Sequence, residues 1–229
     1  MVKWVPDRSG RFSQRPHYAM DEIDRECEQL MKAFLRRHRG RATCPIRTDD
    51  LMMLIEQEAS DLDTYAELDD GVEGITHFFH DGKPKVQISR LLTEDDRREN
   101  RLRTTLTHEL WHVKYHNFIF FFDQGPFVAP PTDGPLFSPS CKRDGMIDAH
   151  ESDWLEWQAG YASGALLMPI SALQRVVEAF LDRHELTTPL CATDAPGQEL
   201  IRYAQAKFQV SADAARVRLL KRGYLFTMP

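Results

Sequence analysis

His108-Glu109-Leu110-Trp111-His112 is the stretch of this 229-residue chain that decides both its fold and its chemistry. On a helix, the HExxH pattern places two imidazoles one turn apart on one face, with a carboxylate beside them. Zinc-dependent peptidases use this arrangement to hold the ion and to activate water. The same pattern also fits a buried helix whose histidines are hydrogen-bonded in the core, so the surrounding sequence must separate the two interpretations.

The residues that flank the motif predict an amphipathic helix. Thr93 and Asp96 supply a start signal, and the arginines that follow begin a helical pattern. The apolar residues recur at helical spacing and form one stripe: Leu102, Leu106, Leu110 and Val113. We therefore expect this stripe to face a core, with the two histidines along its flank.

The rest of the chain predicts an α+β fold. Helices are expected at 18–38, 48–58, 154–168, 171–184, 198–208 and 211–222. A β-hairpin is expected to join 75–80 to 85–89 through Asp81-Gly82, a dipeptide that favours a tight turn. We predict a zincin-like arrangement, in which the HExxH helix packs on a small, mostly antiparallel sheet with additional N- and C-terminal helices.

Three segments follow from this pattern. They are an N-terminal arm and helix at 1–45, a metallopeptidase domain at 46–185 and a C-terminal helical segment at 186–229, expected to pack as one structural unit. Within them, residues 1–18 are expected to be extended. The apolar run 118–122 predicts a strand, and a loop at 123–152 contains Cys141.

Composition and charge narrow the function classes. The N-terminus lacks a signal-peptide pattern and no run of about 18 apolar residues occurs, so we expect a cytoplasmic protein without a membrane partner. Four scattered cysteines form no CxxC pair, which favours reduced thiols. Residues 1–47 hold 11 Lys+Arg against 6 Asp+Glu, and 199–229 hold 6 against 2. Such basic ends are more commonly solvated helix faces, and the alternative is contact with a nucleic acid or an acidic partner.

A catalytic zinc ion needs a third protein ligand. His116 is excluded because histidines at i, i+4 and i+8 span about 12 Å of a straight helix, which leaves it a flanking role. Glu156 is the preferred ligand because it opens a helix rich in small residues that can approach the first helix closely. Its competing interpretation is a capping box with Asp153. His150, Glu151 and Asp153 are the alternative ligands, whereas His77 and His80 are interpreted as strand residues.

Three ordered blocks resemble the ImmA/IrrE family of metallopeptidases: the stretch 104–112, the helix from Glu156 to Pro169, and the C-terminal pattern that starts at Phe208-Gln209-Val210-Ser211. The similarity extends from about Ile46 to Leu220, with departures at Trp111, where glycine is common, and at Gly160, where asparagine or aspartate is usual. A long insertion also separates His112 from Glu156, which affects substrate access.

The resemblance implies one zinc ion held by His108, His112 and Glu156, with Glu109 as the catalytic base. It also implies cleavage of a helix-turn-helix transcriptional repressor, which switches on mobile-element, stress or phage-defence genes. The competing class is a non-cleaving regulatory module that binds DNA or a partner on the same scaffold, and a protease toxin is a third option. A nucleic acid or another ligand is a candidate activator.

Two further hypotheses concern individual side chains. Tyr161, Tyr115 and His116 are candidate donors to the oxyanion that forms during hydrolysis, and the sequence does not choose among them. Cys141 is a candidate fourth zinc ligand in a latent state, in which a thiolate from the loop displaces the catalytic water. The alternative interpretation is that Cys141 has no role at the metal site, as is common for a lone cysteine.

Overall fold

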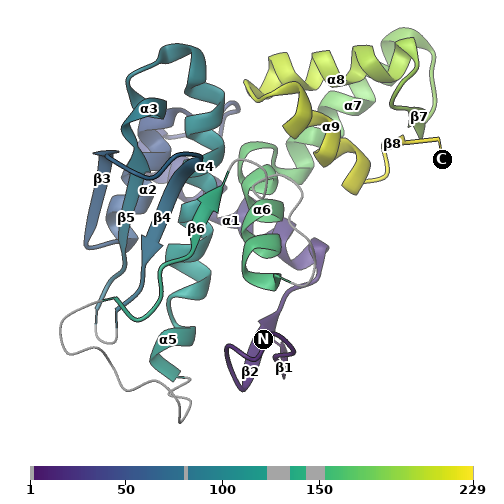
Figure 1. Ribbon diagram of the computed structural model, residues 1–229. Helices are drawn as coiled ribbons and strands as arrows, with labels where there is room; N and C mark the ends of the chain where they lie inside the picture. The colour runs from purple at the N-terminus through teal and green to yellow at the C-terminus, as the bar shows by residue number, and fades with distance from the viewer. Residues whose placement is uncertain (1–2, 80–81, 123–134, 143–152, 229) are drawn as a thin grey trace.

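Helix α4 (Glu99–Trp111), which carries the start of the HExxH motif, packs between a small sheet and a second helix (Figure 1). The computed structural model describes residues 3–79, 82–122, 135–142 and 153–228, which form a mixed α+β structure. α4 contacts a four-stranded sheet on one side and α6 (Trp154–Leu167) on the other. The predicted stripe at Leu102, Leu106, Leu110 and Val113 is buried, as its helical spacing predicts.

The four-stranded sheet has the order β3-β5-β4-β6. Its strands are β3 (Asp61–Ala66), β4 (Val72–His77), β5 (Lys85–Ser89) and β6 (Ser140–Lys142). β4 runs antiparallel to both of its neighbours, whereas β3 runs parallel to β5. β4 and β5 were expected from their alternating pattern, but β3 and β6 were not. Val86 and Ile88 of β5 are fully buried in the same core cluster as Leu106 of α4.

The N-terminal part of the chain closes the opposite side of α6. α1 (Met20–Arg39) contacts α6 and ends at Gly40, whose positive φ of 72° suits glycine at a helix C-terminus. The preceding arm is a paired hairpin of β1 (Lys3–Pro6) and β2 (Gln14–His17). The extended backbone was predicted there, but its pairing was not.

The remaining elements are α2 (Thr48–Glu58), α3 (Arg90–Thr93), η1 (Asp96–Arg98), η2 (His112–His116), α5 (Ile119–Phe122), α7 (Ile170–His184), β7 (Leu190–Cys191), α8 (Ala195–Phe208), α9 (Ala212–Lys221) and β8 (Leu225–Phe226). The helices α2, α7, α8 and α9 occur at the predicted places, whereas the paired strands β7 and β8 were not predicted. The predicted strand at 118–122 is wrong, because this apolar run is helical in α5. The start of the HExxH helix is also divided, since α3 and η1 precede α4.

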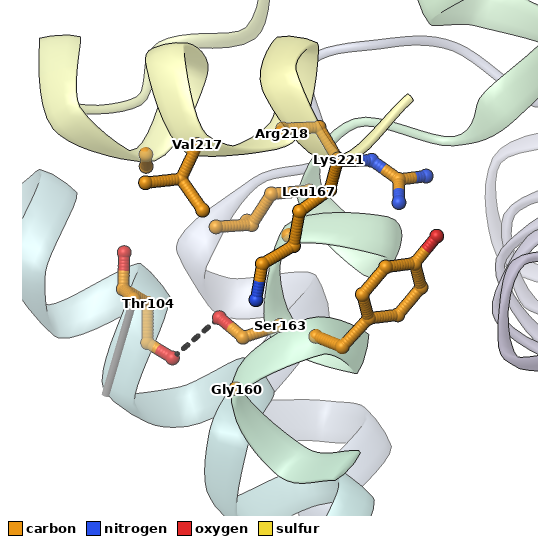
Figure 2. A pocket seen from close by; sticks show the side chains of 10 residues that line it. Thr104, Gly160, Ser163, Leu167, Val217, Arg218 and Lys221 are labelled. Carbon is orange, nitrogen blue, oxygen red and sulfur yellow. Dashed lines mark hydrogen bonds between the residues drawn. The ribbon is translucent and has the colours of Figure 1, made fainter. Parts of the chain in front are cut away.

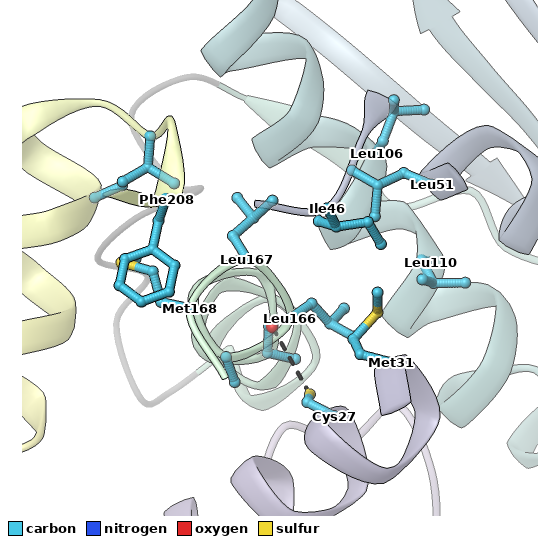
Figure 3. Close-up of a cluster of buried hydrophobic side chains, with 14 of the residues drawn as sticks. Cys27, Met31, Ile46, Leu51, Leu106, Leu110, Leu166, Leu167, Met168 and Phe208 are labelled. Carbon is cyan, nitrogen blue, oxygen red and sulfur yellow. Dashed lines mark hydrogen bonds between the residues drawn. The ribbon is translucent and has the colours of Figure 1, made fainter. Parts of the chain in front are cut away.

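A continuous hydrophobic core joins all three segments expected from the sequence (Figure 3). Cys27 and Met31 of α1 lie on one side of α6, and Leu106 and Leu110 of α4 lie on another. The small residues of α6 permit this close approach: Ala159, Ala162 and Ala165 are fully buried. The Cys27 thiol donates to the carbonyl of Ala162 at 3.8 Å. α6 therefore packs between α1 and α4.

Among the described helices, no single one is long and apolar enough to cross a membrane. α6 and α7 reach that length and composition only as a pair, bent by 59° at the break between them.

Candidate metal centre

Three side chains from two helices converge on one point. His108 of α4, His112 at the start of η2 and Glu156 in the first turn of α6 form what we call the metal-ligand cluster. His108 Nε2 lies 3.1 Å from Glu156 Oε2 and 3.1 Å from His112 Nε2. His112 Nε2 lies 3.4 Å from Glu156 Oε1. These donor atoms are close enough together for one metal ion to contact all three.

A hydrogen-bonded link between α4 and α6 fixes the position of Glu156. The hydroxyl of Ser163 on α6 lies 2.8 Å from that of Thr107 on α4 and also donates to the carbonyl of Thr104 at 3.1 Å (Figure 2). The first turn of α6 is thereby held against the end of α4 that carries the histidines.

The charges in the metal-ligand cluster depend on one another. Burial alone would raise the pKa of Glu156, but the two histidines lower it well below its usual value. Burial alone would lower the pKa of His108, but its hydrogen bond to Glu156 and the nearby charges raise it. His108 Nδ1 has no hydrogen-bond partner among the described residues. The cluster thus binds positive charge strongly, either as protons on imidazole or as a metal cation.

Glu109 lies beside the metal-ligand cluster and is completely buried. Thr76 of β4 donates to its Oε2 at 2.5 Å, whereas Oε1 has no hydrogen-bond partner among the described residues. Burial raises the pKa of this carboxyl group above its ordinary value. Gly74 makes room for it, since a Cβ there would lie 2.6 Å from Glu109 Oε1 and 2.8 Å from Thr105 Cγ2. A fixed carboxylate with one free oxygen is suited to accept a proton.

Strand β6 brings Cys141 to the same place. Cys141 pairs with Gly74 in the β4–β6 ladder, and its thiol can share a metal ion with His108 and Glu109, because their ligand atoms lie within 4.8 Å of one another. The thiol is buried, which raises its pKa well above the usual range, and the charges of Glu109 and Glu156 add to this effect. The structure therefore brings together the preferred site residues, which are His108, Glu109, His112, Glu156 and Cys141.

The alternative ligands lie elsewhere or outside the described residues. Asp153 makes an ion pair with Arg11 at 3.0 Å, and its side chain does not cap α6. The capping-box interpretation of Glu156 is therefore wrong. His77 lies between Ser138 and Gln87, both at 2.8 Å, as expected for a strand residue. His80, His150 and Glu151 lie outside the described residues.

The three candidate oxyanion donors have other partners. Tyr161 donates its hydroxyl to Asp24 at 3.0 Å, in a second polar cluster. Tyr115 stacks on Trp111 with a centroid distance of 4.1 Å. His116 lies behind His112, with 2.9 Å between their Nδ1 atoms. Among the described residues, none of the three contacts the open side of the metal-ligand cluster.

Three residues at the site had not been singled out from the sequence: Gly74, Thr76 and Gln158. The first two lie on a strand that was predicted, but their role depends on the packing of β4 against α4, which no local pattern specifies. Gln158 follows Glu156 by two positions and reaches His116 at 3.0 Å. The π-helical turn η2 places His116 there, and such turns are frequent at functional sites.

Comparison with protein-family models gives no match for this chain, and a search of curated proteins finds none either.

Proposed function

We propose that the chain is a zinc-dependent endopeptidase with a zincin-like active site. The convergence of His108 Nε2, His112 Nε2 and a Glu156 oxygen is the observation that carries the proposal. A tetrahedral zinc site with bonds of about 2.05 Å has ligand-to-ligand distances of about 3.3 Å. The observed separations of 3.1, 3.1 and 3.4 Å match this spacing. Two imidazoles and a carboxylate are also an established ligand set of catalytic zinc.

The chain's own residues divide the work of peptide hydrolysis. When bound, zinc supplies a Lewis acid that polarises the scissile carbonyl and acidifies water. Glu109 accepts a proton at Oε1 and returns it to the leaving amine, while Thr76 holds the other oxygen in place. Burial raises the pKa of Glu109, which favours its uptake of a proton.

The edge of β4 is the proposed place for an extended substrate. β4 runs beside Glu109, and a peptide that adds to a sheet edge gains main-chain hydrogen bonds. In the described structure β6 occupies that edge with Cys141 opposite Gly74. A substrate strand would need the main-chain hydrogen bonds of β4 that β6 now makes. While β6 is paired there, the substrate cannot bind, which is how a latent enzyme would behave. The resemblance to the ImmA/IrrE peptidases supports a helix-turn-helix repressor as the substrate.

Cys141 is the proposed latch of this latent state. A thiolate at about 2.3 Å can take the fourth zinc position and exclude water from it. Its proximity to His108 and Glu109 supports this role. A nucleic acid or another ligand that displaces β6 would activate the enzyme, and the basic ends of the chain are candidate contact points.

Metal analysis and a cleavage assay test the peptidase. We expect one zinc per chain, cleavage of the co-expressed repressor, and a loss of about 10²–10⁴-fold in rate for Glu109→Gln with zinc retained. If protein prepared in the presence of excess zinc contains no bound metal, the proposal is refuted. Unchanged cleavage by Glu109→Gln would remove this residue from the mechanism, and regulation without any cleavage would favour the non-cleaving binding module.

A cysteine substitution tests the latch separately. Cys141→Ser is expected to raise basal cleavage in the absence of an activator, because serine is a much poorer zinc ligand than a thiolate. Cys44→Ser is the matched control, since Cys44 is an exposed free thiol outside the site. If Cys141→Ser shows the parent's basal rate across several substrates and redox conditions, Cys141 is not a latch.

A further inference from the structure

A line of buried hydrogen-bonding groups runs from His112 to the N-terminal hairpin. His112 Nδ1 lies 2.9 Å from His116 Nδ1, on the side of the ring opposite the metal-ligand cluster. His116 Nε2 lies 3.0 Å from Gln158 Oε1, and Gln158 Nε2 donates to the carbonyl of Pro16 in β2 at 3.1 Å. His112, His116 and Gln158 are each at most 1% exposed. Water therefore has little access to these groups, and they must satisfy one another.

The Pro16 carbonyl favours one placement of the protons along this line. A carbonyl oxygen only accepts, so the amide nitrogen of Gln158 faces Pro16 and the amide oxygen faces His116. The amide oxygen also only accepts, so His116 carries its proton on Nε2. A neutral imidazole has one proton, which leaves His116 Nδ1 as an acceptor for the Nδ1 proton of His112. His112 Nε2 then presents a lone pair to the metal-ligand cluster.

Trp111 favours the opposite tautomer of His116, with the proton on Nδ1. Its indole Nε1 lies 3.2 Å from His116 Nε2 and can only donate. If His116 Nε2 accepts this bond, its proton moves to Nδ1, and His112 must then accept at Nδ1 and carry its own proton on Nε2. That proton would point at Glu156 Oε1, 3.4 Å away, and would block metal binding. The contacts thus define two tautomers of His112, of which only one is a metal ligand.

We propose that His116 and Gln158 are positioning residues that hold His112 in its metal-binding tautomer. This inference rests on the metal site of the proposed function. It assigns a role to the β1–β2 hairpin, because the Pro16 carbonyl orients Gln158 and thereby orients the whole line. Partners that accept the second ring proton of a metal-ligating histidine fix its tautomer and orientation and raise its basicity.

Histidine nitrogen NMR of the unmodified, zinc-loaded protein tests the tautomers directly. With ¹⁵N-labelled histidine, long-range proton–nitrogen correlations distinguish Nδ1–H from Nε2–H rings, and His116→Phe identifies the His116 signals. We expect a proton on Nε2 of His116 and on Nδ1 of His112. A His116 proton on Nδ1 in the zinc-loaded protein would overturn the proposal without the need for any cleavage assay.

Zinc affinity measured by chelator competition gives an independent test. His116→Phe and Gln158→Met remove acceptors from the line, and each is expected to weaken zinc binding about 10–100-fold. Cys27→Ala is the matched control, because it removes another buried hydrogen bond to α6 that does not lead to the metal-ligand cluster. We expect parental zinc affinity for the control and a folded metal-free state for all three, by circular dichroism.

The outcomes separate this inference from the proposed function. Parental zinc affinity in His116→Phe and Gln158→Met would refute the positioning role and leave the peptidase proposal intact. An equal loss in Cys27→Ala would assign the effect to helix packing and would also refute it. A parent protein that binds no zinc would refute the proposed function itself. Should one of the two variants fail to fold, the zinc affinity of the other still tests the positioning role.

Discussion

α6 carries two buried polar clusters that differ in how their charges are balanced. The first is the metal-ligand cluster at its first turn. The second, about one and a half turns later, is the ion-pair cluster, which consists of Asp24, Tyr161, Arg218 and Arg222. In the ion-pair cluster, two guanidinium groups and a phenol surround one carboxylate. In the metal-ligand cluster, a carboxylate and two imidazoles face one another, and their electron pairs converge on one point.

This difference is the one expected between a structural cluster and a cluster that could bind a metal ion. The Asp24 carboxylate receives hydrogen bonds from Arg218 and Tyr161, so its charge is compensated within the chain. A buried charge that lacks such compensation destabilises a protein. The metal-ligand cluster reaches the same balance only by taking up protons or a cation from outside. The structure therefore predicts opposite responses of the two clusters to metal and to substitution.

Substitution in the ion-pair cluster should have the largest effect on stability. Arg218→Met leaves Asp24 with a buried and only partly paired charge, which we expect to cost about 3–5 kcal/mol of unfolding free energy. Urea denaturation with zinc and with chelator should show the same loss. The less buried Arg216 of the same helix provides the control, Arg216→Met. A loss that disappears when zinc is added would contradict the structural role of this cluster.

Zinc should stabilise the protein only through the metal-ligand cluster. Zinc at one hundred times its dissociation constant is expected to raise the unfolding free energy by about 2.7 kcal/mol, because only the folded chain assembles the three ligands. Thermal unfolding with and without zinc measures this shift. His112→Ala should abolish the shift, and Arg218→Met should retain it. An identical melting temperature for the parent in zinc and in chelator would show that the cluster is not a metal site.

Gly74→Ala tests how tightly Glu109 is enclosed. The added Cβ would lie 2.6 Å from Glu109 Oε1, so we expect a loss of about 1–3 kcal/mol in stability and a reduced cleavage rate. Gly164→Ala is the control, because its Cβ would meet Arg218 Cδ at an ordinary 3.5 Å. Denaturation and cleavage assays on both variants give the comparison. Full activity in Gly74→Ala would show that the position of Glu109 is not critical.

The smallest predicted effect is a pH dependence of zinc affinity. Burial opposes protonation of His108, but Glu156 and Glu109 raise its pKa above 6.5 in the metal-free protein. Zinc must displace that proton, so affinity should fall about tenfold per pH unit below this raised pKa. Competition titrations between pH 8 and pH 5 measure the slope. An affinity that is constant over this range would show that zinc displaces no proton.

The sequence predicted the elements that carry local periodicity. α4, α6 and Glu156 followed from helical spacing, small residues and the stop at Pro169. The prediction of a strand at 118–122 was wrong because five consecutive apolar residues show neither a helical nor a strand period. In the structure, Ile119 and Phe120 of this segment pack in one cluster with Phe78. β6, Thr76 and Gln158 depend on contacts between segments far apart in the chain. No short window of sequence contains that information.

The separation of the ligands along the chain also has a consequence during synthesis. Glu156 follows His112 by 44 positions, so a ribosome at about 5–20 residues per second needs several seconds to add the last ligand after the histidine pair. Until α6 has emerged and packed against α4, the growing polypeptide has only two of the three zinc ligands. Under the proposed function, a nascent chain would therefore not hydrolyse other proteins before its own fold is complete.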